Sequence, residues 1–312
     1  MPAMNSRQAQ VIDPILSTQA RGYTNQEFIG HRILPFADIP NRSMKVIKFG
    51  KDAFRRYLNT RRAPGAATQR VQFGYASDPV SLRQEALEAL VPDEIGGDAA
   101  RVPGIDLASV SINAVQDIIA LGREVEVASI VRNPALYDGN HKVALAGSDK
   151  FSDPDSDPAA IIREGRESVR RSIGRYPNVL AIAPSVFNVL SDHPKIKERF
   201  KYTSSESITE AMLAKYFDLD EVIVGKAVAL AEGAADTDQA DDVWGDDALL
   251  FYRAGTSFLV PSFGFIYRLK GYPLVEQPYY ERPVKSWVYP LTEEYRPYVT
   301  GAEGGFLIQG AV

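Results

Sequence analysis

The longest periodic stretch of the chain runs from Asp106 to Arg132. Its apolar residues recur every three or four positions, which keeps one face of a helix apolar, whereas a strand would require alternation. The main stripe is Leu107, Val110, Ala114, Ile118, Leu121, Val125 and Ala128, and a second stripe is Ile112, Val115 and Ile119. Asp106 is expected to cap the helix, and Asn133-Pro134 to end it. The pattern predicts a helix of roughly 40 Å that is covered on at least two sides.

Two segments before this helix have too little apolar surface to form a core of their own. Residues 1–41 carry scattered apolar residues and are interrupted by Pro14, Pro35 and Pro40, so we expect an extended arm that packs onto its own body or onto a neighbour. Residues 42–92 predict a long hairpin, with strands at 44–49 and 70–75 around a tip rich in Arg, Ala and Gly. Because two lone strands are marginally stable in water, we expect other copies of the chain to support this hairpin and the arm.

The remainder of the chain mixes short strands and helices. Asp157-Pro158 starts a second helix that ends near Gly174. A compact α/β lobe is predicted from strands at 142–146, 179–183, 221–224 and 248–252 and from helices at 184–190 and 209–217. From Phe263 onward the pattern predicts strands separated by prolines, at 263–269, 284–289, 296–300 and 306–309. This last sheet is expected to cover the long helix.

Length and composition narrow the class of protein. At 312 residues the chain exceeds one comfortable hydrophobic core, so two lobes are expected. It has no cysteine, which excludes disulfides, thiolate metal sites and cysteine nucleophiles and suits a reducing cytoplasm. No run approaches eighteen apolar residues, and the first twenty residues lack the apolar core of a signal peptide. We therefore predict no membrane association.

Charge is distributed unevenly. Between residues 42 and 70 there are nine basic residues and one acid, whereas residues 232–247 contain seven acids and no base. Such blocks suggest that charged surfaces of neighbouring copies meet, or that one block faces nucleic acid; two unrelated solvated loops are the alternative. The candidate inter-subunit contacts are these basic residues and two aromatic residues of the arm: Arg42, Lys45, Lys48, Lys51, Arg55, Arg56, Arg61, Arg62, Arg70, Tyr23 and Phe28.

Catalytic patterns are missing from the sequence. It has no dinucleotide or phosphate loop, no G-x-S-x-G elbow and no H-E-x-x-H, and His31, His141 and His193 show no ligand spacing. Asp153, Asp155, Asp157 and Glu164 match part of a calcium loop, but Pro158 occupies the position that needs glycine. We predict no catalytic residue, metal or cofactor. The alternatives of other classes are a metal-dependent hydrolase and a nucleic-acid-binding module led by the hairpin arginines.

The order of these elements resembles the major capsid proteins of tailed bacteriophages, which have the α+β HK97-like fold. Local stretches are similar too: the strand and helix of Gly174-Arg-Tyr-Pro-Asn-Val-Leu-Ala-Ile-Ala-Pro-Ser-Val-Phe-Asn-Val-Leu190, and the segments 193–200, 213–217, 221–227, 243–245 and 248–252. The resemblance implies six parts: an N-arm (1–41), an E-loop hairpin (42–92), a P-domain (93–157) with its spine helix (106–132), an A-domain (158–261), a P-domain strand return (262–300) and a C-terminal strand (301–312).

The resemblance also implies a function. The chain would be a non-enzymatic shell subunit of the virion, assembled in the host cytoplasm into hexamers and pentamers of an icosahedral head. The head would enclose double-stranded DNA, contacted non-specifically, and would have scaffold, decoration and portal proteins as partners. Because the arm begins almost at Met1, a separate scaffold protein, or none, is expected. An encapsulin-like nanocompartment shell is the alternative of similar fold.

Overall fold

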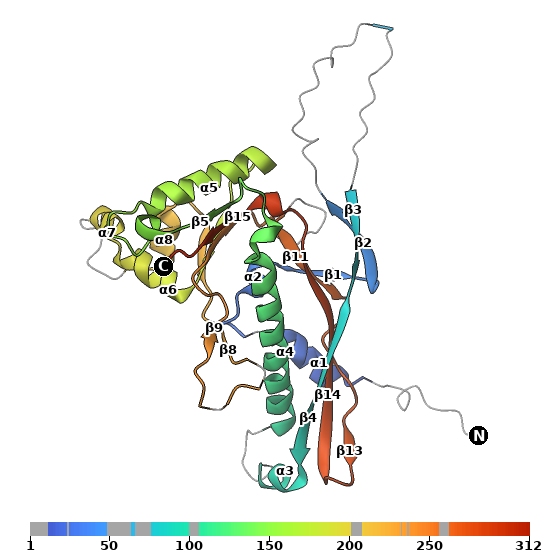
Figure 1. Ribbon diagram of the computed structural model, residues 1–312. Coiled ribbons are helices and arrows are strands. Elements are labelled where there is room, and N and C mark those ends of the chain that lie inside the picture. The colour runs from blue at the N-terminus through green and yellow to red at the C-terminus, as the bar shows by residue number, and fades with distance from the viewer. Residues whose placement is uncertain are drawn as a thin grey trace.

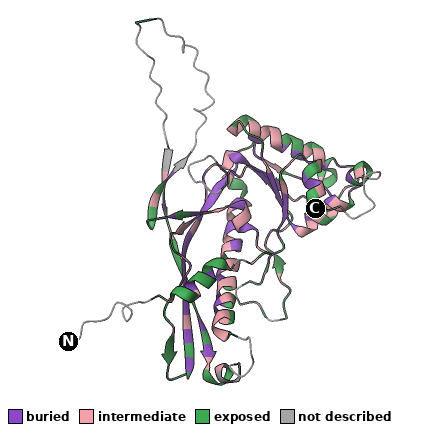
Figure 2. Cartoon of the chain, turned by 180° about the vertical axis from the view of Figure 1, so that it is seen from behind, coloured by how far each residue is buried: buried purple, intermediate pink, exposed green. Residues whose placement is uncertain are grey.

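The fold is built on two β-sheets joined by one long helix (Figure 1). The computed structural model describes residues 12–23, 25–48, 64–65, 76–99, 106–200, 208–231, 233–235, 237–255 and 262–312. One connected hydrophobic core runs through both sheets, and the buried residues follow them in Figure 2. None of the described helices is long and apolar enough to cross a membrane.

The long helix α4 spans Leu107–Val131, as predicted, and the Asp106 side chain accepts a hydrogen bond from the Ala108 N–H at its start. The face that it buries is not the main stripe. Ile112, Val115 and Ile119 are buried, whereas Val110, Ile118 and Val125 are 58%, 60% and 41% exposed. Both stripes are apolar, so periodicity alone could not tell which one packs on the sheet.

The six-stranded sheet covers this helix. Its strands are β1 (Phe36–Ile39), β4 (Arg83–Pro92), β11 (Gly264–Leu269), β12 (Leu274–Val275), β13 (Tyr279–Glu281) and β14 (Ser286–Val299). β14 is the central strand: it pairs with β4 along ten residues on one side and with β13, β12 and β11 in turn on the other. α4 packs against β4 and β14, which confirms the predicted cover.

β14 corrects the prediction of two strands separated by prolines, because it runs through Pro290 and Pro297 without a break. In an antiparallel strand the N–H and C=O of one residue point to the same side. The Pro290 carbonyl accepts from Glu276, so its missing N–H faces the gap between β12 and β13. Ile266, opposite Pro297, donates its N–H to Pro35, so Pro297 turns its nitrogen away from β11. Neither proline removes a ladder bond.

The arm packs onto its own chain. Helix α1 (Pro14–Gly22) lies against β12 and α4, helix α2 (Gly30–Ile33) lies against α4, and β1 pairs in parallel with β11. Ile29, Ile33 and Leu34 are fully buried there. Of the two surfaces expected for the arm, residues 12–39 therefore use their own body rather than a neighbour for burial, because their apolar side chains match the surface of α4 and β11. Residues 1–11 lie outside the described ranges.

The hairpin stem consists of β2 (Ser43–Lys48) and β3 (Ala76–Ser81), which pair antiparallel from Ser43↔Ser81 to Lys48↔Ala76. Val46 and Val80 pack with Ile39 and Phe265 in a second, smaller core at the base of the stem. The predicted second strand at 70–75 lies outside the described residues, as does most of the predicted tip. Residues 83–92, predicted as part of the hairpin, form β4 of the sheet, and the short helix α3 (Asp93–Ala99) follows.

The five-stranded sheet and its helices form the body that we call the A-lobe. The strand order is β5-β15-β10-β6-β7, from Lys142–Ala144, Gly305–Gln309, Ala248–Phe251, Val179–Ile182 and Glu221–Val224. The helices are α5 (Pro158–Ile173), α6 (Pro184–Asp192), α7 (Pro194–Phe200) and α8 (Glu210–Tyr216). A small hairpin, β8 (Val228–Ala229) and β9 (Asp241–Asp242), projects from it. The predicted helix start is confirmed, since Asp157 caps α5.

Strand pairing does not follow the chain order. The last strand, β15, was predicted to join the sheet that covers α4. It lies instead between β5 and β10 in the A-lobe, so this prediction is wrong. β5 comes from the predicted P-domain range and belongs to the same A-lobe sheet. The domain boundaries themselves stay a prediction.

Candidate inter-subunit contact surfaces

Arg42, the first predicted contact residue, stands at the base of the hairpin stem. Its Nε and Nη2 atoms donate to the two carboxylate oxygens of Glu294, at 2.8 and 2.9 Å, and Tyr272 donates to the same carboxylate. The Arg42 side chain remains 72% exposed, while that of Glu294 is 3% exposed. The hydrogen bonds from Arg42 hold the pKa of Glu294 below its usual range. Arg42 therefore anchors the stem within its own chain and still presents a cationic surface.

The other basic candidates divide into two groups. Lys45, on β2, is exposed, and Lys48 ends the same strand. The remaining six lie outside the described residues: Lys51, Arg55, Arg56, Arg61, Arg62 and Arg70. Their role in contacts between subunits stays a prediction.

The aromatic candidates of the arm lie close to the long helix. The Tyr23 hydroxyl donates to Asp117 on α4 at 2.8 Å, and that hydrogen bond raises the pKa of the tyrosine. Phe28 is half-buried just before α2. For Tyr23 this contact fixes the arm within its own chain, and what a second copy adds at either residue stays a prediction.

Glu124 fixes the arm to the body, and the only signal of this role in the sequence is an acid within the apolar pattern of the long helix. Its carboxylate, 2% exposed on α4, accepts from the backbone N–H groups of Ile29 and Gly30 at 2.9 and 2.7 Å. It also accepts from the indole N–H of Trp244 at 2.8 Å. Burial raises the pKa of Glu124, although these three donors oppose the shift. One side chain thus ties the arm, the long helix and the A-lobe together.

A second link connects the arm to the A-lobe. Glu221, the first residue of β7, forms ion pairs with Arg32 of α2 and with Arg253, whose Nη1 also donates to the Arg32 carbonyl at 2.6 Å. Burial pushes the pKa of Glu221 upward, but the two guanidinium groups outweigh it and leave the pKa lowered. The arm therefore contacts both sheets of its own chain.

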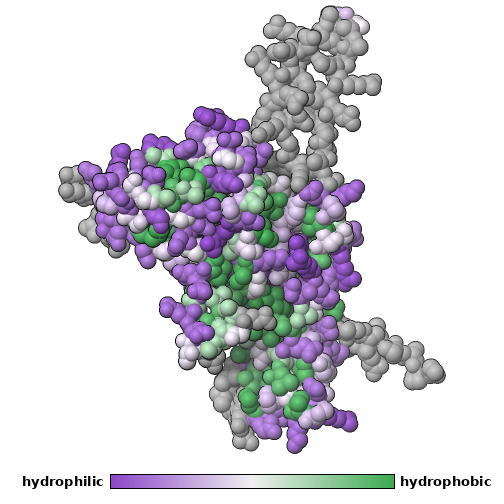
Figure 3. Space-filling model, in the orientation of Figure 1, coloured by the Kyte–Doolittle hydropathy of each residue, from purple (hydrophilic) through white to green (hydrophobic). Residues whose placement is uncertain are grey.

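Exposed apolar side chains gather at the far end of the six-stranded sheet, on both faces of β4, β13 and the start of β14, and Figure 3 shows apolar surface toward that end of the molecule. We call this set the sheet-end patch; it consists of Leu87, Leu90, Ile95, Tyr279, Tyr280, Val284 and Trp287. Leu90 is 52% exposed and Trp287 is 44% exposed. The sequence analysis missed this surface. The continuous apolar run Ala89-Leu90-Val91 was the available signal, because a strand that is apolar on both faces requires cover on both.

The histidines and the acidic motif have local structural roles. The His141 ring shares a hydrogen bond of 2.6 Å with Asp138, and His193 lies 3.2 Å from the Ser156 hydroxyl. Asp157 caps α5, and the Asp153 side chain accepts from the Asp155 N–H. Among the described residues, no group of three or more His, Cys, Asp or Glu side chains is placed to hold a metal ion.

Solved structures with this arrangement include phage capsids and an encapsulin. The capsid structure of cyanophage P-SCSP1u is 10% identical in sequence, with a TM-score of 0.55, and the match covers 89% of this chain and 86% of that one; at this identity it shows the fold alone. A phage-related protein from Bordetella bronchiseptica RB50 is 44% identical, with a TM-score of 0.82 over 97% of this chain and 98% of that one. The class is thus an α+β, HK97-like capsid fold.

Sequence comparison adds the family. The model of phage major capsid protein E matches residues 137–280. The major capsid protein of Burkholderia phage BcepMu is 32% identical over 308 residues, which cover 96% of this chain and 97% of that protein. The chain belongs to the phage major capsid proteins, a family of structural components of the virion. These relatives favour a phage shell over the encapsulin-like alternative, which shares the fold.

Proposed function

We propose that the protein builds its shell as hexamers and pentamers of an icosahedral phage head, held together by the hairpin, the arm and the sheet-end patch. Family membership supplies the shell, and the sheet-end patch carries the proposal for this chain. Monomeric proteins rarely leave several large apolar side chains exposed side by side, and such patches mark protein contacts. Leu90 and Trp287 are both exposed on the paired strands β4 and β14; because Val288 lies opposite Leu90, the two side chains are on opposite faces of the sheet, and each face of this end leaves apolar side chains uncovered.

The basic hairpin supplies the second contact in this proposal. Its nine basic residues, from Arg42 to Arg70, contact an adjacent copy and extend the buried area toward the scale of permanent assemblies. The exposed guanidinium of Arg42 and the exposed Lys45 support this assignment at the stem. The packaged double-stranded DNA is contacted through its phosphates without sequence preference. Scaffold, decoration and portal proteins complete the head, which assembles in the host cytoplasm.

The role is mechanical rather than catalytic. Arg42, Tyr23 and Glu124 each act by holding backbone or carboxylate groups in place, and the three histidines belong to different parts of the chain. Repeated contacts between copies resist the pressure of the packaged genome.

Expression of the chain alone, followed by electron microscopy and sedimentation, tests this function. The unaltered protein is expected to form closed particles. The double variant Leu90→Asp/Trp287→Asp should remain as unassembled subunits with an unchanged circular dichroism spectrum, because both side chains are already exposed. Ile15→Asp, at an apolar residue that is 78% exposed outside the patch, is the matched control and should still assemble. Particles of normal yield from the double variant would contradict the assignment of the patch.

A further inference from the structure

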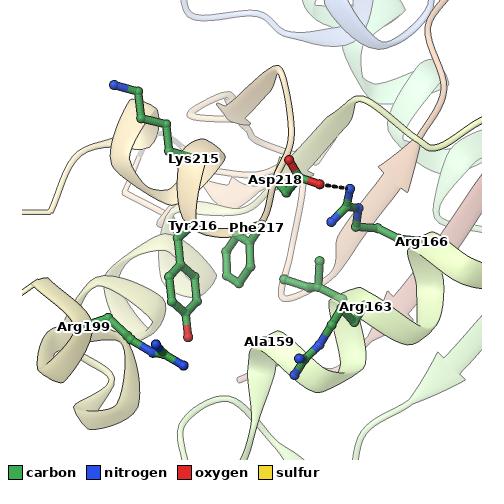
Figure 4. A pocket seen from close by; sticks show the side chains of 9 residues that line it. Ala159, Arg163, Arg166, Arg199, Lys215, Tyr216, Phe217 and Asp218 are labelled. Atoms are coloured by element: carbon green, nitrogen blue, oxygen red, sulfur yellow. Dashed lines mark hydrogen bonds and ion pairs between the residues drawn. The ribbon is translucent and has the colours of Figure 1, made fainter.

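The A-lobe contains a positively charged cleft between α5, α7 and α8. Its volume is about 490 Å³, and its polar lining comes from Arg163, Arg166, Arg199, Lys215, Tyr216 and Asp218. Figure 4 shows the guanidinium groups of Arg163 and Arg199 and the hydroxyl of Tyr216 directed toward the same opening. Three guanidinium groups and one carboxylate line the cleft, whereas the Lys215 ammonium group points away from the opening in Figure 4, so the cleft is positively charged in a chain whose net charge is −5.

The carboxylate that lines the cleft already has an ion-pair partner. Asp218 pairs with Arg166, whose guanidinium also lies 5.1 Å from the centre of the Tyr176 ring. Within the described part of the chain, Arg163 and Arg199 have no hydrogen-bond or ion-pair partner, and the buried Nε of Arg166 has none either. Converging guanidinium groups repel one another, and a planar carboxylate or phosphate offers them two acceptors at once. The cleft is therefore built to receive an anion.

The complementary surface of this chain is the β8–β9 hairpin. Asp241 and Asp242 form β9 and are both exposed, and their carboxylates have no hydrogen-bond or ion-pair partner among the described residues. The surrounding segment, residues 232–247, contains seven acids and no base. The exposed Val228 lies opposite Asp242 in the hairpin and shares its face, so an apolar side chain accompanies this carboxylate, as Ala159 and Phe217 accompany the cations of the cleft. Charge and polarity both complement the cleft.

The two surfaces cannot meet within one chain. In Figure 1 α5 runs along one edge of the A-lobe, and the β8–β9 hairpin projects from the opposite edge. A contact between unlike surfaces on opposite edges joins copies head to tail, and such contacts close into rings when the rotation between copies allows it. The hexamers and pentamers of the proposed function are rings of this kind.

We propose that the cleft of one copy receives the acidic β8–β9 hairpin of the next copy in the ring, with Arg163 and Arg199 binding the carboxylates of Asp241 and Asp242. The proposal rests on the proposed assembly into rings and assigns one of its contacts. Phosphate groups of nucleic acid share the chemistry of the anion, but Asp241 and Asp242 are present at fixed stoichiometry in every ring. The contact also gives the acidic segment a role that the sequence left open.

A charge exchange tests the contact. Arg163→Glu/Arg199→Glu and Asp241→Arg/Asp242→Arg should each lower the yield of particles by about tenfold or more, because like charges then face each other at every contact. The variant that carries all four substitutions should recover to within about twofold of the unaltered protein, since opposite charges meet again. The matched control for the arginine pair is Arg171→Glu/Lys270→Glu, which changes the net charge as Arg163→Glu/Arg199→Glu does but at exposed positions outside both surfaces. It should assemble normally.

The outcomes separate this contact from the shell function itself. Normal particle yield from either double variant overturns the proposal, and so does failure of the fourfold variant while circular dichroism shows each protein folded. If Arg163→Glu/Arg199→Glu forms particles at normal yield that retain less DNA, the cleft binds the phosphates of nucleic acid, and the proposed contact with the β8–β9 hairpin is overturned as well. Failure of the unaltered chain to form particles would instead contradict the proposed assembly.

Discussion

The arm and the hairpin are adjacent in the chain and other copies were expected to support both, yet the arm packs extensively on its own chain. The arm, residues 12–39, buries Ile29 and Ile33 against α4 and anchors two of its N–H groups on Glu124. Among the described residues of the hairpin, Val46 and Val80 pack at the base of the stem. An extended segment is thus stabilised within its own chain where its apolar side chains and its N–H groups both find partners.

The largest effect is expected at the arm's buried anchor. Glu124→Ala leaves three buried donors without an acceptor and should lower the free energy of unfolding by about 4 kcal/mol. Urea unfolding of the unassembled subunit measures this loss. Glu126→Ala on the same helix is the control and should cost less than about 1 kcal/mol, because its ion pairs with Arg83 and Arg296 are long, at 3.6 Å. Equal losses in the two variants would contradict the role of Glu124.

Glu124 also makes stability depend on pH in a particular direction. Its pKa is raised in the fold, so the folded protein binds this proton more tightly than the unfolded chain does. This group therefore contributes stability at low pH, and the contribution is lost as the pH rises through the raised pKa. Unfolding of the subunit across the acidic range should reveal this slope, and Glu124→Gln should abolish it.

A side chain of the arm supplies the next effect. Ile33→Ala creates a cavity beneath α4 and should lower the free energy of unfolding by about 3 kcal/mol. The matched change on the hairpin, Lys45→Ala at an exposed position, should alter it by less than about 0.5 kcal/mol. Calorimetry or urea unfolding of both variants measures the contrast. A large loss at Lys45 would mean that the hairpin stem stabilises the subunit as much as the arm does.

Arg42, at the base of the hairpin, is expected to act through pH. Arg42 lowers the pKa of Glu294, so this ion pair contributes stability above the ordinary pKa of a glutamate, and the contribution is lost as the pH falls through the lowered value. Arg42→Gln should therefore be less stable than the unaltered subunit near neutral pH, with the difference vanishing in acid. Unfolding midpoints at both pH values check this, and a difference that persists in acid would contradict it.

The smallest effect is expected at Tyr23. Tyr23→Phe removes one hydrogen bond to Asp117 at a half-buried position and should cost about 0.5 kcal/mol. Urea unfolding beside Ile33→Ala gives the comparison. A loss as large as that of Ile33→Ala would show that the polar contact, rather than burial, holds the arm.

Particular residues show what could be predicted from the sequence and why the rest could not. The start signals at Asp106 and Asp157 placed both long helices, because capping and proline geometry act locally. The buried face of α4 could not be chosen, since two apolar stripes compete and the choice depends on which one the distant strands β4 and β14 cover. Strand order failed for the same reason: β15 pairs with β5, more than 150 residues earlier.

The sequence revealed the charge of the candidate contact surfaces but not where the fold places them. The basic and acidic blocks were visible as composition, and the hairpin stem matched its predicted first strand. The cleft at Arg163 and Arg199 was not visible, because its lining comes from three helices that only the fold brings together. The sheet-end patch depended on which side of β4 the long helix covers.

Removal of the hairpin beyond its stem tests most directly the claim that the arm stabilises the subunit whereas the hairpin stabilises the assembly. Residues 50–75 are replaced by Asn-Gly, a pair suited to a tight turn between two strands. The account predicts an unfolding free energy within about 0.5 kcal/mol of the unaltered subunit, with no closed particles in electron microscopy. Closed particles at normal yield, or a subunit that no longer folds, would contradict it.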